Sequence, residues 1–301
     1  MVSRSNAANE FAHAEALWSE QLLSDGYCII PMVATEARMA DIRLDLAADF
    51  AETPLCTGDF YGARTQRFGR LLIRSSHVAS IVAHPTMLAL AQLVFGPWCD
   101  TIQLNLTQAI AIHPGAPAQF PHRDQDMWRG DVGVREYLLN VIWPLDAFTF
   151  DNGATLIWPN SHGAAAGAPT PSEQPVVAAC GPGDAIVFLG STLHGAGANV
   201  SSTVRHGIIV SYCLGWLKPY ENQWLAYPPE VARHFAPELA ALVGYQQHRP
   251  NLGNYEGQCP SILLGDQVPD RLGAIDALRP DQQALLAEHM AHPGSEHGAT
   301  A

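Results

Sequence analysis

Apolar residues recur at helical spacing in the N-terminal third of the chain. Between residues 11 and 23 they fall three or four positions apart, which predicts an amphipathic helix. Thr35 is a suitable N-cap for a second helix that runs to about residue 50. Residues 85–94 predict a third helix, which Gly96 and Pro97 then end.

The hydrophobic pattern changes from helical to strand-like near residue 101. Short runs rich in β-branched and aromatic residues alternate there with Gly, Pro and Asn, which is the pattern of a sheet. The predicted strands cover residues 27–30, 101–113, 136–145, 153–158, 175–179, 184–189 and 204–214. Their close spacing is typical of a sandwich or barrel and not of alternating βαβ units.

The C-terminal part of the chain returns to helices and loops. Pro229 is well placed in the first turn of a helix that follows Pro228. Residues 163–175 and 246–270 are rich in Gly, Pro and Asn and are predicted to be loops, and the tail after His292 is small, polar and predicted to be disordered. We expect one domain over residues 1–301, with helices over about 10–96, a strand-rich core over about 100–217, and helices and loops over 218–291.

Composition and charge narrow the class of protein. Hydrophobic residues make up 48% of the chain, enough for a packed core, and the formal charge of −13 argues against a nucleic-acid-binding surface, which needs clustered Lys and Arg. No run approaches the roughly 20 apolar residues of a membrane span, and residues 1–20 lack the pattern of a signal peptide. The six cysteines contain no C-x-x-C pair, which favours reduced thiols in a cytoplasmic protein.

Three residues form a candidate metal site: His122, Asp124 and His194. In a strand, residues i and i+2 point the same way, so His122 and Asp124 can share one metal ion while Arg123 points away. His194 follows the apolar run at residues 184–189 and can complete the set from the opposite sheet. Two imidazoles and one carboxylate are the ligands of non-heme Fe(II) oxygenases. The H-x-D pattern alone is weak, because many proteins contain one by chance.

The sequence around these residues resembles a known family. The segments are Gln119-Phe120-Pro121-His122-Arg123-Asp124, Asn152-Gly153-Ala154-Thr155, Pro159-Asn160-Ser161-His162, Pro182-Gly183-Asp184 and the block from His194 to Arg205. In this order they resemble the phytanoyl-CoA dioxygenase family of Fe(II)/2-oxoglutarate oxygenases, in the branch that makes natural products. The resemblance covers about residues 26–246. It implies a mainly β fold with flanking helices, built on a double-stranded β-helix (a jelly-roll, cupin-like core).

The resemblance also implies the chemistry, with Fe(II), 2-oxoglutarate as co-substrate, and O₂. Arg205 follows the distal histidine at the family's spacing and is expected to bind the far carboxylate of 2-oxoglutarate, because a guanidinium grips a carboxylate through two parallel hydrogen bonds. Gln119 and Thr155 are expected to hydrogen-bond the same molecule, and Arg67 to reach the same pocket. Because Asp124 is present, hydroxylation or a related C–H oxidation is favoured over halogenation.

The expected substrate is a small, largely apolar metabolite of secondary metabolism, because no cluster of Lys and Arg is present to bind coenzyme A phosphates. Gln103, Asn105 and several tryptophans could line its pocket, although such residues serve equally in a sheet or a core. The tryptophans are Trp128, Trp143, Trp158, Trp216 and Trp224. Residues 221–224 and 244–246 resemble the branch whose members often form homodimers.

Two other classes of protein stay open at this point. One is a cupin-like metalloenzyme with the same three ligands that does not use 2-oxoglutarate. The other is a non-catalytic β-sandwich that binds a ligand beside an incidental metal site. The presence of Arg205 speaks against the first, and a failure to bind Fe(II) would favour the second. Of the remaining histidines, His162 is expected to be structural or to support the site, and His206 to face away from Arg205 on its strand.

Overall fold

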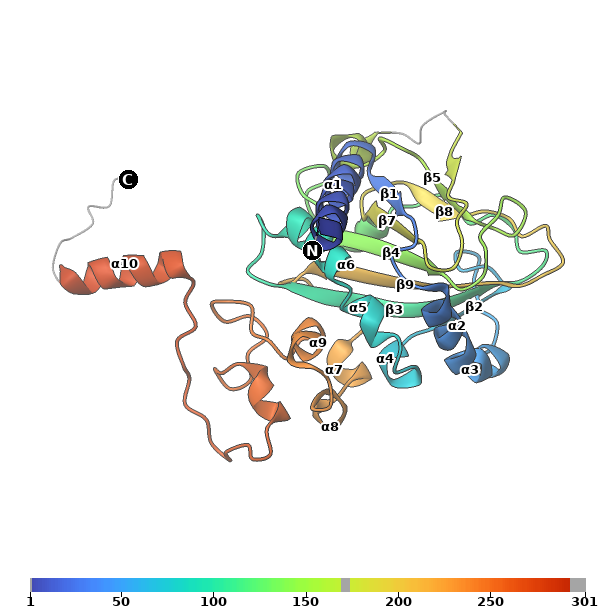
Figure 1. Ribbon diagram of the computed structural model, residues 1–301. Coiled ribbons are helices and arrows are strands. Elements are labelled where there is room, and N and C mark those ends of the chain that lie inside the picture. Colours follow the sequence, from blue (N-terminus) through green and yellow to red (C-terminus); the bar gives the residue numbers. More distant parts are fainter. Residues whose placement is uncertain (1, 169–173, 293–301) are drawn as a thin grey trace.

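Two antiparallel β-sheets form the centre of the molecule (Figure 1). The computed structural model describes residues 2–168 and 174–292. One sheet has six strands in the order β1-β7-β4-β9-β3-β2, and the other has three in the order β6-β5-β8. The strands are β1 (Tyr27–Ile30), β2 (Thr65–Phe68), β3 (Ile102–Ile112), β4 (Leu138–Pro144), β5 (Thr155–Ile157), β6 (Val176–Val177), β7 (Ala185–Leu189), β8 (His194–Ala196) and β9 (Arg205–Leu214).

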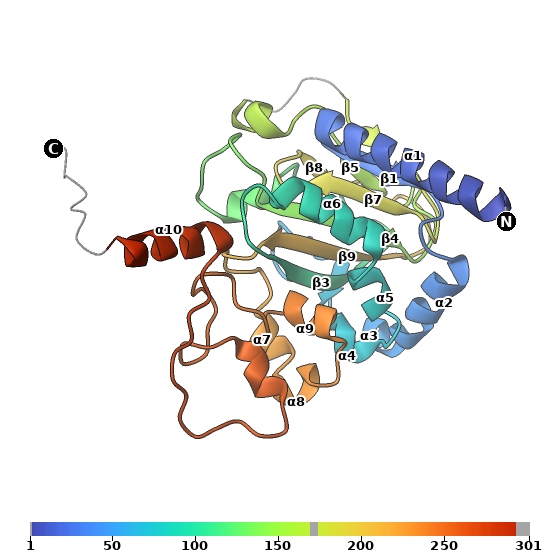
Figure 2. The same cartoon turned by 60° about the vertical axis from the view of Figure 1, so that its left-hand side comes forward.

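Helices cover the outer face of the six-stranded sheet (Figures 1 and 2). Helix α6 packs against β3, β4 and β9, and the short helices α4, α7 and α9 pack against β3. The helices are α1 (Val2–Asp25), α2 (Glu36–Asp45), α3 (Ala47–Glu52), α4 (Leu71–Arg74), α5 (Ala79–Val82), α6 (Pro85–Phe95), α7 (Gln223–Ala226), α8 (Pro229–Ala232), α9 (Pro237–Leu242) and α10 (Pro280–Ala291). Helix α10 lies apart from the sheets in both views and buries no residue.

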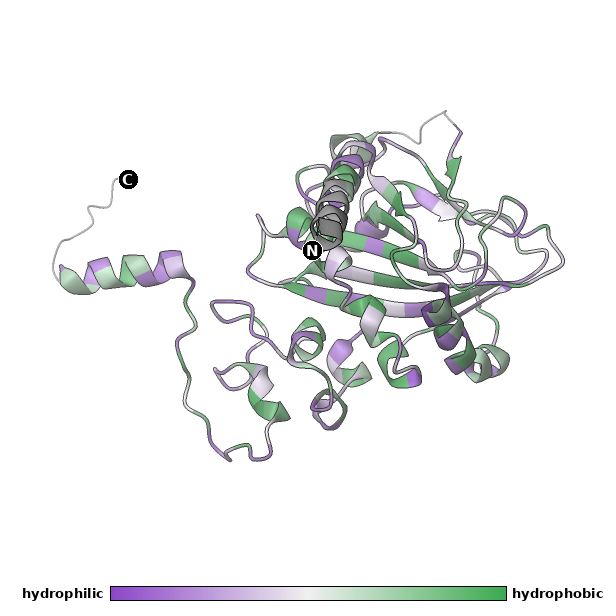
Figure 3. Cartoon of the chain, in the orientation of Figure 1, coloured by the Kyte–Doolittle hydropathy of each residue, from purple (hydrophilic) through white to green (hydrophobic). Residues whose placement is uncertain are grey.

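Strand β4 shows how the period of a strand separates the core from a cavity. Leu139, Val141 and Trp143 belong to the main hydrophobic core beneath the helices. The alternate residues Asn140 and Ile142 line a cavity that lies between the two sheets. Hydrophobic positions dominate this central strand in Figure 3, which fits a strand buried on both faces.

The predicted strands are present, most of them one or two residues shorter at each end. The helix predicted up to residue 50 is wrong as a single element, because it breaks at Leu46 into α2 and α3. Strand β2 and helices α4 and α5 were not predicted, since four residues are too few to show a period. The two predicted loops each contain a short 3-10 helix, at Gly163–Gly167 and Pro260–Leu264, and the tail after His292 lies outside the described residues.

Two further features concern the helices and the cysteines of the described residues. None of its helices is both long and apolar enough to cross a membrane. The six cysteines are all free thiols, as the sequence predicts. Two of them, Cys28 and Cys213, are buried, and burial raises the pKa of the Cys28 thiol to about 12. These thiols therefore behave as small core residues and not as reactive groups.

Candidate metal centre

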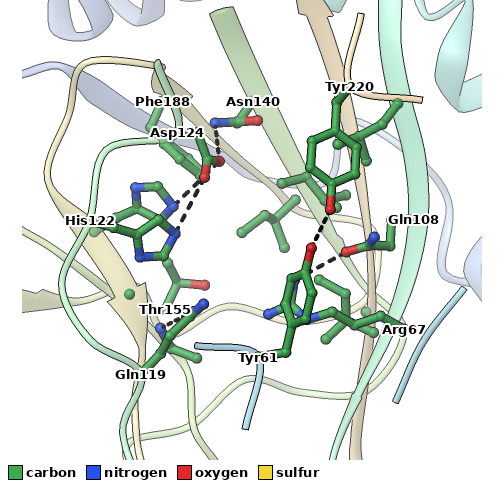
Figure 4. A pocket seen from close by; sticks show the side chains of 18 of the residues that line it. Tyr61, Arg67, Gln108, Gln119, His122, Asp124, Asn140, Thr155, Phe188 and Tyr220 are labelled. Atoms are coloured by element: carbon green, nitrogen blue, oxygen red, sulfur yellow. Dashed lines mark hydrogen bonds and ion pairs between the residues drawn. The ribbon is translucent and has the colours of Figure 1, made fainter. Parts of the chain in front are cut away.

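The structure brings His122, Asp124 and His194 together at one end of the cavity (Figure 4). The Nε2 atom of His122 lies 3.3 Å from Oδ1 of Asp124, and Nε2 of His194 lies 3.6 Å from Oδ2. His194 opens strand β8, and its backbone exchanges two hydrogen bonds with His122, of 2.9 and 3.0 Å. The two histidines are thus direct backbone partners, and the prediction that His194 comes from the opposite sheet is wrong.

The predicted strand geometry of the H-x-D segment holds only in part. Asp124 begins a 3-10 helix, Asp124–Met127, so the segment is not a continuous strand. Arg123 is still extended, with φ −116° and ψ 122°, which is enough to turn His122 and Asp124 to the same side. The guanidinium of Arg123 donates to the carbonyl of Ser161 at 3.3 Å.

Each imidazole is oriented by a backbone carbonyl. Nδ1 of His122 lies 2.9 Å from the carbonyl oxygen of Phe120, and Nδ1 of His194 lies 3.1 Å from that of Thr192. A carbonyl oxygen can only accept, so Nδ1 of each imidazole donates, which leaves Nε2, the nitrogen nearer to Asp124, to bind a metal ion. This is the tautomer that a metal ion requires, held by partners that the protein itself supplies.

Two of the three side chains, Asp124 and His194, favour the charge state that a metal ion requires. Burial by itself would raise the pKa of Asp124, but the neighbouring His194 and His122 lower it to about 2. Burial lowers the pKa of His194, whereas for His122 the effect of burial is outweighed by Asp124, which raises its pKa. A carboxylate and a neutral imidazole are the protonation states that bind a divalent cation. The donor set therefore fits iron(II), for which two histidines and one carboxylate leave one face open.

The open face looks into a cavity of about 370 Å³. Its walls come from both sheets and are mainly aliphatic or aromatic, with Leu106, Ile110, Ile112, Leu138, Ile142, Phe188 and Ile209 among them. The tryptophans proposed from the sequence are not part of the wall, and Trp143 and Trp158 are buried elsewhere. Asn105 lines the cavity, but Gln103 does not and donates instead to the carbonyls of Leu214 and Leu217.

Arg205 lies in the same cavity as the three candidate ligands. Its side chain is buried, with 5% of the residue exposed, and rests over the ring of Phe148 at 4.0 Å. Within residues 2–168 and 174–292 it forms no ion pair, and its Nε atom has no hydrogen-bond partner. Burial, and then the charge of Arg67, lower its pKa to about 9. A buried cation without a counter-ion is costly, so this position fits an anionic ligand.

The other residues expected to bind 2-oxoglutarate also line the cavity. Thr155 is buried at the start of β5, and its hydroxyl takes part in none of the hydrogen bonds found in the described part of the chain. Gln119 is engaged at both ends of its amide, because its Nε2 donates to the carbonyl of Phe60 at 3.3 Å and its Oε1 accepts from the backbone N–H of Ala196 at 3.4 Å. Arg67 donates to Oε1 of Gln108 at 3.1 Å, and burial lowers its pKa.

Sequence reasoning missed several residues of the cavity. Asn140 donates to Oδ2 of Asp124 at 3.0 Å. Tyr61 and Tyr220 join their hydroxyls across the cavity from the metal ligands, beside Arg67 (Figure 4). A signal for Asn140 was present, since it is the one amide within the apolar run from Leu138 to Trp143. The tyrosines come from two loops and carry no comparable signal.

The two histidines set aside in the sequence lie outside the cavity. Nε2 of His162 lies 3.1 Å from the carbonyl oxygen of Leu23, which ties the end of α1 to the loop after β5. His206 faces the opposite side of β9 from Arg205, as predicted, and its Nδ1 lies 2.6 Å from Oδ2 of Asp146. Neither histidine competes for the metal site.

Comparison with known proteins identifies the family. The family model for phytanoyl-CoA dioxygenase (PhyH) matches residues 22–207. The dioxygenase cdmD of Talaromyces verruculosus is 32% identical over 214 residues, which cover 68% of each chain. The dioxygenase trt7 of Aspergillus terreus is 33% identical over 189 residues, which cover 61% of this chain and 66% of that one. The matches thus span about two thirds of the length of these fungal relatives.

Solved structures share the fold at lower identity. The non-heme alpha ketoglutarate dependent epimerase SnoN from nogalamycin biosynthesis has a TM-score of 0.57 and 19% identity, over 68% of this chain and 82% of that one. HygX from Streptomyces hygroscopicus, solved with nickel, 2-oxoglutarate and hygromycin B bound, has a TM-score of 0.53 and 15% identity, over 67% and 89%. These neighbours confirm the predicted jelly-roll core with flanking helices.

The fold and the site together define a non-heme iron oxygenase. The chain belongs to the phytanoyl-CoA dioxygenase family, whose model matches more than half of it. Membership confirms the predicted enzyme class, a 2-oxoglutarate-dependent dioxygenase with iron and O₂.

Proposed function

We propose that the protein holds Fe(II) with His122, Asp124 and His194, binds the far carboxylate of 2-oxoglutarate with Arg205, and oxidises a C–H bond of a small, largely apolar metabolite. The observation that carries the proposal is the buried Arg205 guanidinium, which has no counter-ion in the described residues and shares a cavity with the three metal ligands. Thr155, Gln119 and Arg67 complete the co-substrate site.

The residues of the chain bind and orient, while the bound groups supply the oxidising power. When bound, iron, 2-oxoglutarate and O₂ provide a strong oxidant and release succinate and carbon dioxide. Arg205 fixes the direction of the co-substrate by a charge-assisted contact. The aliphatic walls exclude water and leave the substrate carbon facing the metal ligands.

The cavity supports an uncharged and mainly hydrocarbon substrate. A volume of about 370 Å³ is near the lower end of the roughly 300–1,000 Å³ of ligand pockets. Because the co-substrate takes part of that volume, only the reacting portion of a larger metabolite fits inside. The rest would contact exposed apolar side chains such as Phe60, which lines the cavity and is 48% exposed. Three arginines line the cavity, but Arg67 and Arg205 are assigned to the co-substrate and Arg123 donates to the carbonyl of Ser161, so they do not form a separate cluster for coenzyme A phosphates.

The relatives support a role in secondary metabolism. SnoN and its neighbour SnoK, a carbocyclase, both come from nogalamycin biosynthesis. An epimerase and a carbocyclase on one core indicate that hydroxylation is one of several outcomes open to this site. The buried Arg205, which forms no ion pair within the described residues, supports an oxo-acid co-substrate over a metalloenzyme that does without one. The enzyme class leaves no support for a purely ligand-binding sandwich.

The test loads the metal-free protein with Fe(II) anaerobically, adds 2-oxoglutarate and O₂, and follows succinate. A panel of free polycyclic and terpenoid compounds is compared with matched acyl-coenzyme A thioesters. We expect the free compounds to stimulate succinate release and to be oxidised. Preferential turnover of the thioesters would overturn the substrate class, and iron binding without 2-oxoglutarate consumption would overturn the co-substrate.

A further inference from the structure

Asn140 is an unusual residue for its position. It lies in the middle of β4, between β7 and β9, where its register partners are Phe188 and Ser211. Only 1% of it is exposed, and the other residues of the strand are apolar. A primary amide in such a place must be desolvated, which is unfavourable unless its polar atoms find partners. Its contacts therefore indicate why an amide occupies this site.

The amide makes one polar contact in the described residues, and that contact is with Asp124. Nδ2 of Asn140 donates to Oδ2 of Asp124 at 3.0 Å, while its own Oδ1 is buried without a hydrogen-bond partner. An asparagine that serves the fold would engage both ends of its amide. Here the carboxylate of Asp124 satisfies the Nδ2 donor of Asn140, while the Oδ1 acceptor has no hydrogen-bond partner in the described residues (Figure 4).

The contact leaves the two oxygens of Asp124 in different states. Oδ2 accepts the amide hydrogen and lies 3.6 Å from Nε2 of His194, whereas Oδ1 lies 3.3 Å from Nε2 of His122 and receives no amide hydrogen. A carboxylate with both oxygens free can rotate and chelate a metal through both of them. A carboxylate that is held by an amide at one oxygen can offer only its other oxygen to the metal ion.

We propose that Asn140 is a positioning residue that fixes the rotation of Asp124 and keeps this carboxylate a one-oxygen ligand. The inference rests on the metal centre of the proposed function. Its consequence is specific: the protein then supplies three donor atoms, so that the positions needed by a chelating co-substrate and by O₂ stay open. Each of the three candidate ligands is thus oriented by one contact. Backbone carbonyls orient the two histidines, and the side chain of Asn140 orients the carboxylate.

The test is a titration of the metal-free protein with Co(II), whose visible absorption reports the number of ligands. Asn140→Leu removes the amide with little change of shape. If this variant does not fold, Asn140→Ser is used instead, because its side chain is too short to contact Asp124. We expect Co(II) affinity to fall by about ten- to a hundredfold, the range found when such outer partners are lost. We also expect weaker visible bands, because a chelating carboxylate raises the coordination number.

Ser211→Ala is the matched control. Ser211 is fully buried and lies opposite Asn140 in the sheet, but its hydroxyl accepts from Asn105 and does not touch the metal ligands. Its Co(II) affinity and spectrum should equal those of the wild type. If the folded Asn140 variant does the same, the proposal is overturned. A loss of affinity with an unchanged spectrum overturns it too, because the carboxylate would have kept its geometry.

Asp124→Ala separates this inference from the proposed function. If that change does not weaken Co(II) binding, the metal centre itself is wrong. If it does, Asn140→Leu should cause no further loss in the Asp124→Ala background, since its effect passes through the carboxylate. An additional loss in the double variant would show that Asn140 acts by another route and would overturn the proposal.

Discussion

The two ends of the cavity differ in how far the protein satisfies its own polar groups. At the metal end, the supporting contacts of His122, His194 and Asp124 come from two carbonyls and one amide of the same chain. At the co-substrate end, Arg67 and Gln119 have partners, but Nε of Arg205 and the hydroxyl of Thr155 have no hydrogen-bond partner in the described residues. We infer that one end is built in advance and that the other is completed by the proposed co-substrate.

This difference has a physical reason. Metal ligands must be aimed before the ion arrives, because an error of a fraction of an ångström weakens every bond to it. A carboxylate-binding site gains most when its cation is desolvated and kept away from competing partners, because the ligand then receives the whole interaction. The comparison predicts that substitutions at one end change metal binding and that substitutions at the other end change the affinity for 2-oxoglutarate.

The largest effect is expected at the metal end. Replacing His122, Asp124 or His194 by Ala removes one of three protein ligands, so bound iron and succinate formation should be lost. The fold should survive, because each side chain lies at the cavity and not in the main core. Metal analysis and circular dichroism of the three variants measure both quantities. Wild-type turnover by Asp124→Ala would show that this carboxylate is not a ligand.

The metal end was also the more predictable from the sequence. Ligand chemistry resides in the residue types, and the i, i+2 spacing of His122 and Asp124 needs only a local extended backbone. Arg205 could be assigned because the family resemblance fixes its distance from His194. The local sequence pattern and the order of the motifs along the chain were enough to predict these residues, without knowledge of how the strands pair.

Residues that depend on strand pairing were beyond the sequence. Asn140 reaches Asp124 only because β4 lies between β7 and β9. The tryptophans were plausible pocket residues by type, yet the sheet turns Trp143 toward the helices and leaves aliphatic residues on the cavity side. The four residues of β2 show no period, although they carry Arg67 into the cavity.

The second largest effect is expected for Arg205→Met, which keeps the length of the side chain and removes its charge. Breaking a buried carboxylate pair costs roughly 3–5 kcal/mol, so the dissociation constant for 2-oxoglutarate should rise at least a hundredfold while iron remains bound. The ligand-free variant should be as stable as the wild type or more so, because an unpaired buried charge has been removed. Calorimetry and thermal unfolding measure the two effects.

Arg67→Met is the matched comparison for this prediction. Arg67 already has a partner in Gln108 and faces the ring of Tyr61 at 5.2 Å. Its loss should therefore lower the affinity for 2-oxoglutarate less than the loss of Arg205 does. If Arg205→Met leaves the dissociation constant unchanged and Arg67→Met raises it, the roles of the two arginines are reversed. The co-substrate would then lie nearer to β2 than we propose.

A smaller effect is expected for Thr155→Val, which removes one hydroxyl at constant shape. A hydrogen bond to a charged group contributes about 1.5–3 kcal/mol, so affinity for 2-oxoglutarate should fall about tenfold or somewhat more. Thr107→Val is the control, because the hydroxyl of Thr107 accepts from the backbone of Leu71 in the core. That change should lower the thermal midpoint and leave the affinity alone. If the wild type, Thr155→Val and Thr107→Val bind 2-oxoglutarate with equal affinity, Thr155 is not part of the co-substrate site.

The smallest effect is expected when the metal is removed and the chain is left intact. In proteins whose metal is structural, the free energy of binding is also the free energy of folding, and chelators unfold them. Here the carbonyls of Phe120 and Thr192 and the amide of Asn140 hold the three ligands without an ion. Chelator treatment should therefore lower the thermal midpoint only by the stabilisation that bound metal adds. It should leave amide hydrogen exchange in β8 slow, since β8 keeps its backbone bonds to β5 and to His122. Fast exchange throughout β8 after chelation would mean that the metal organises its own site, and the contrast between the two ends of the cavity would not hold.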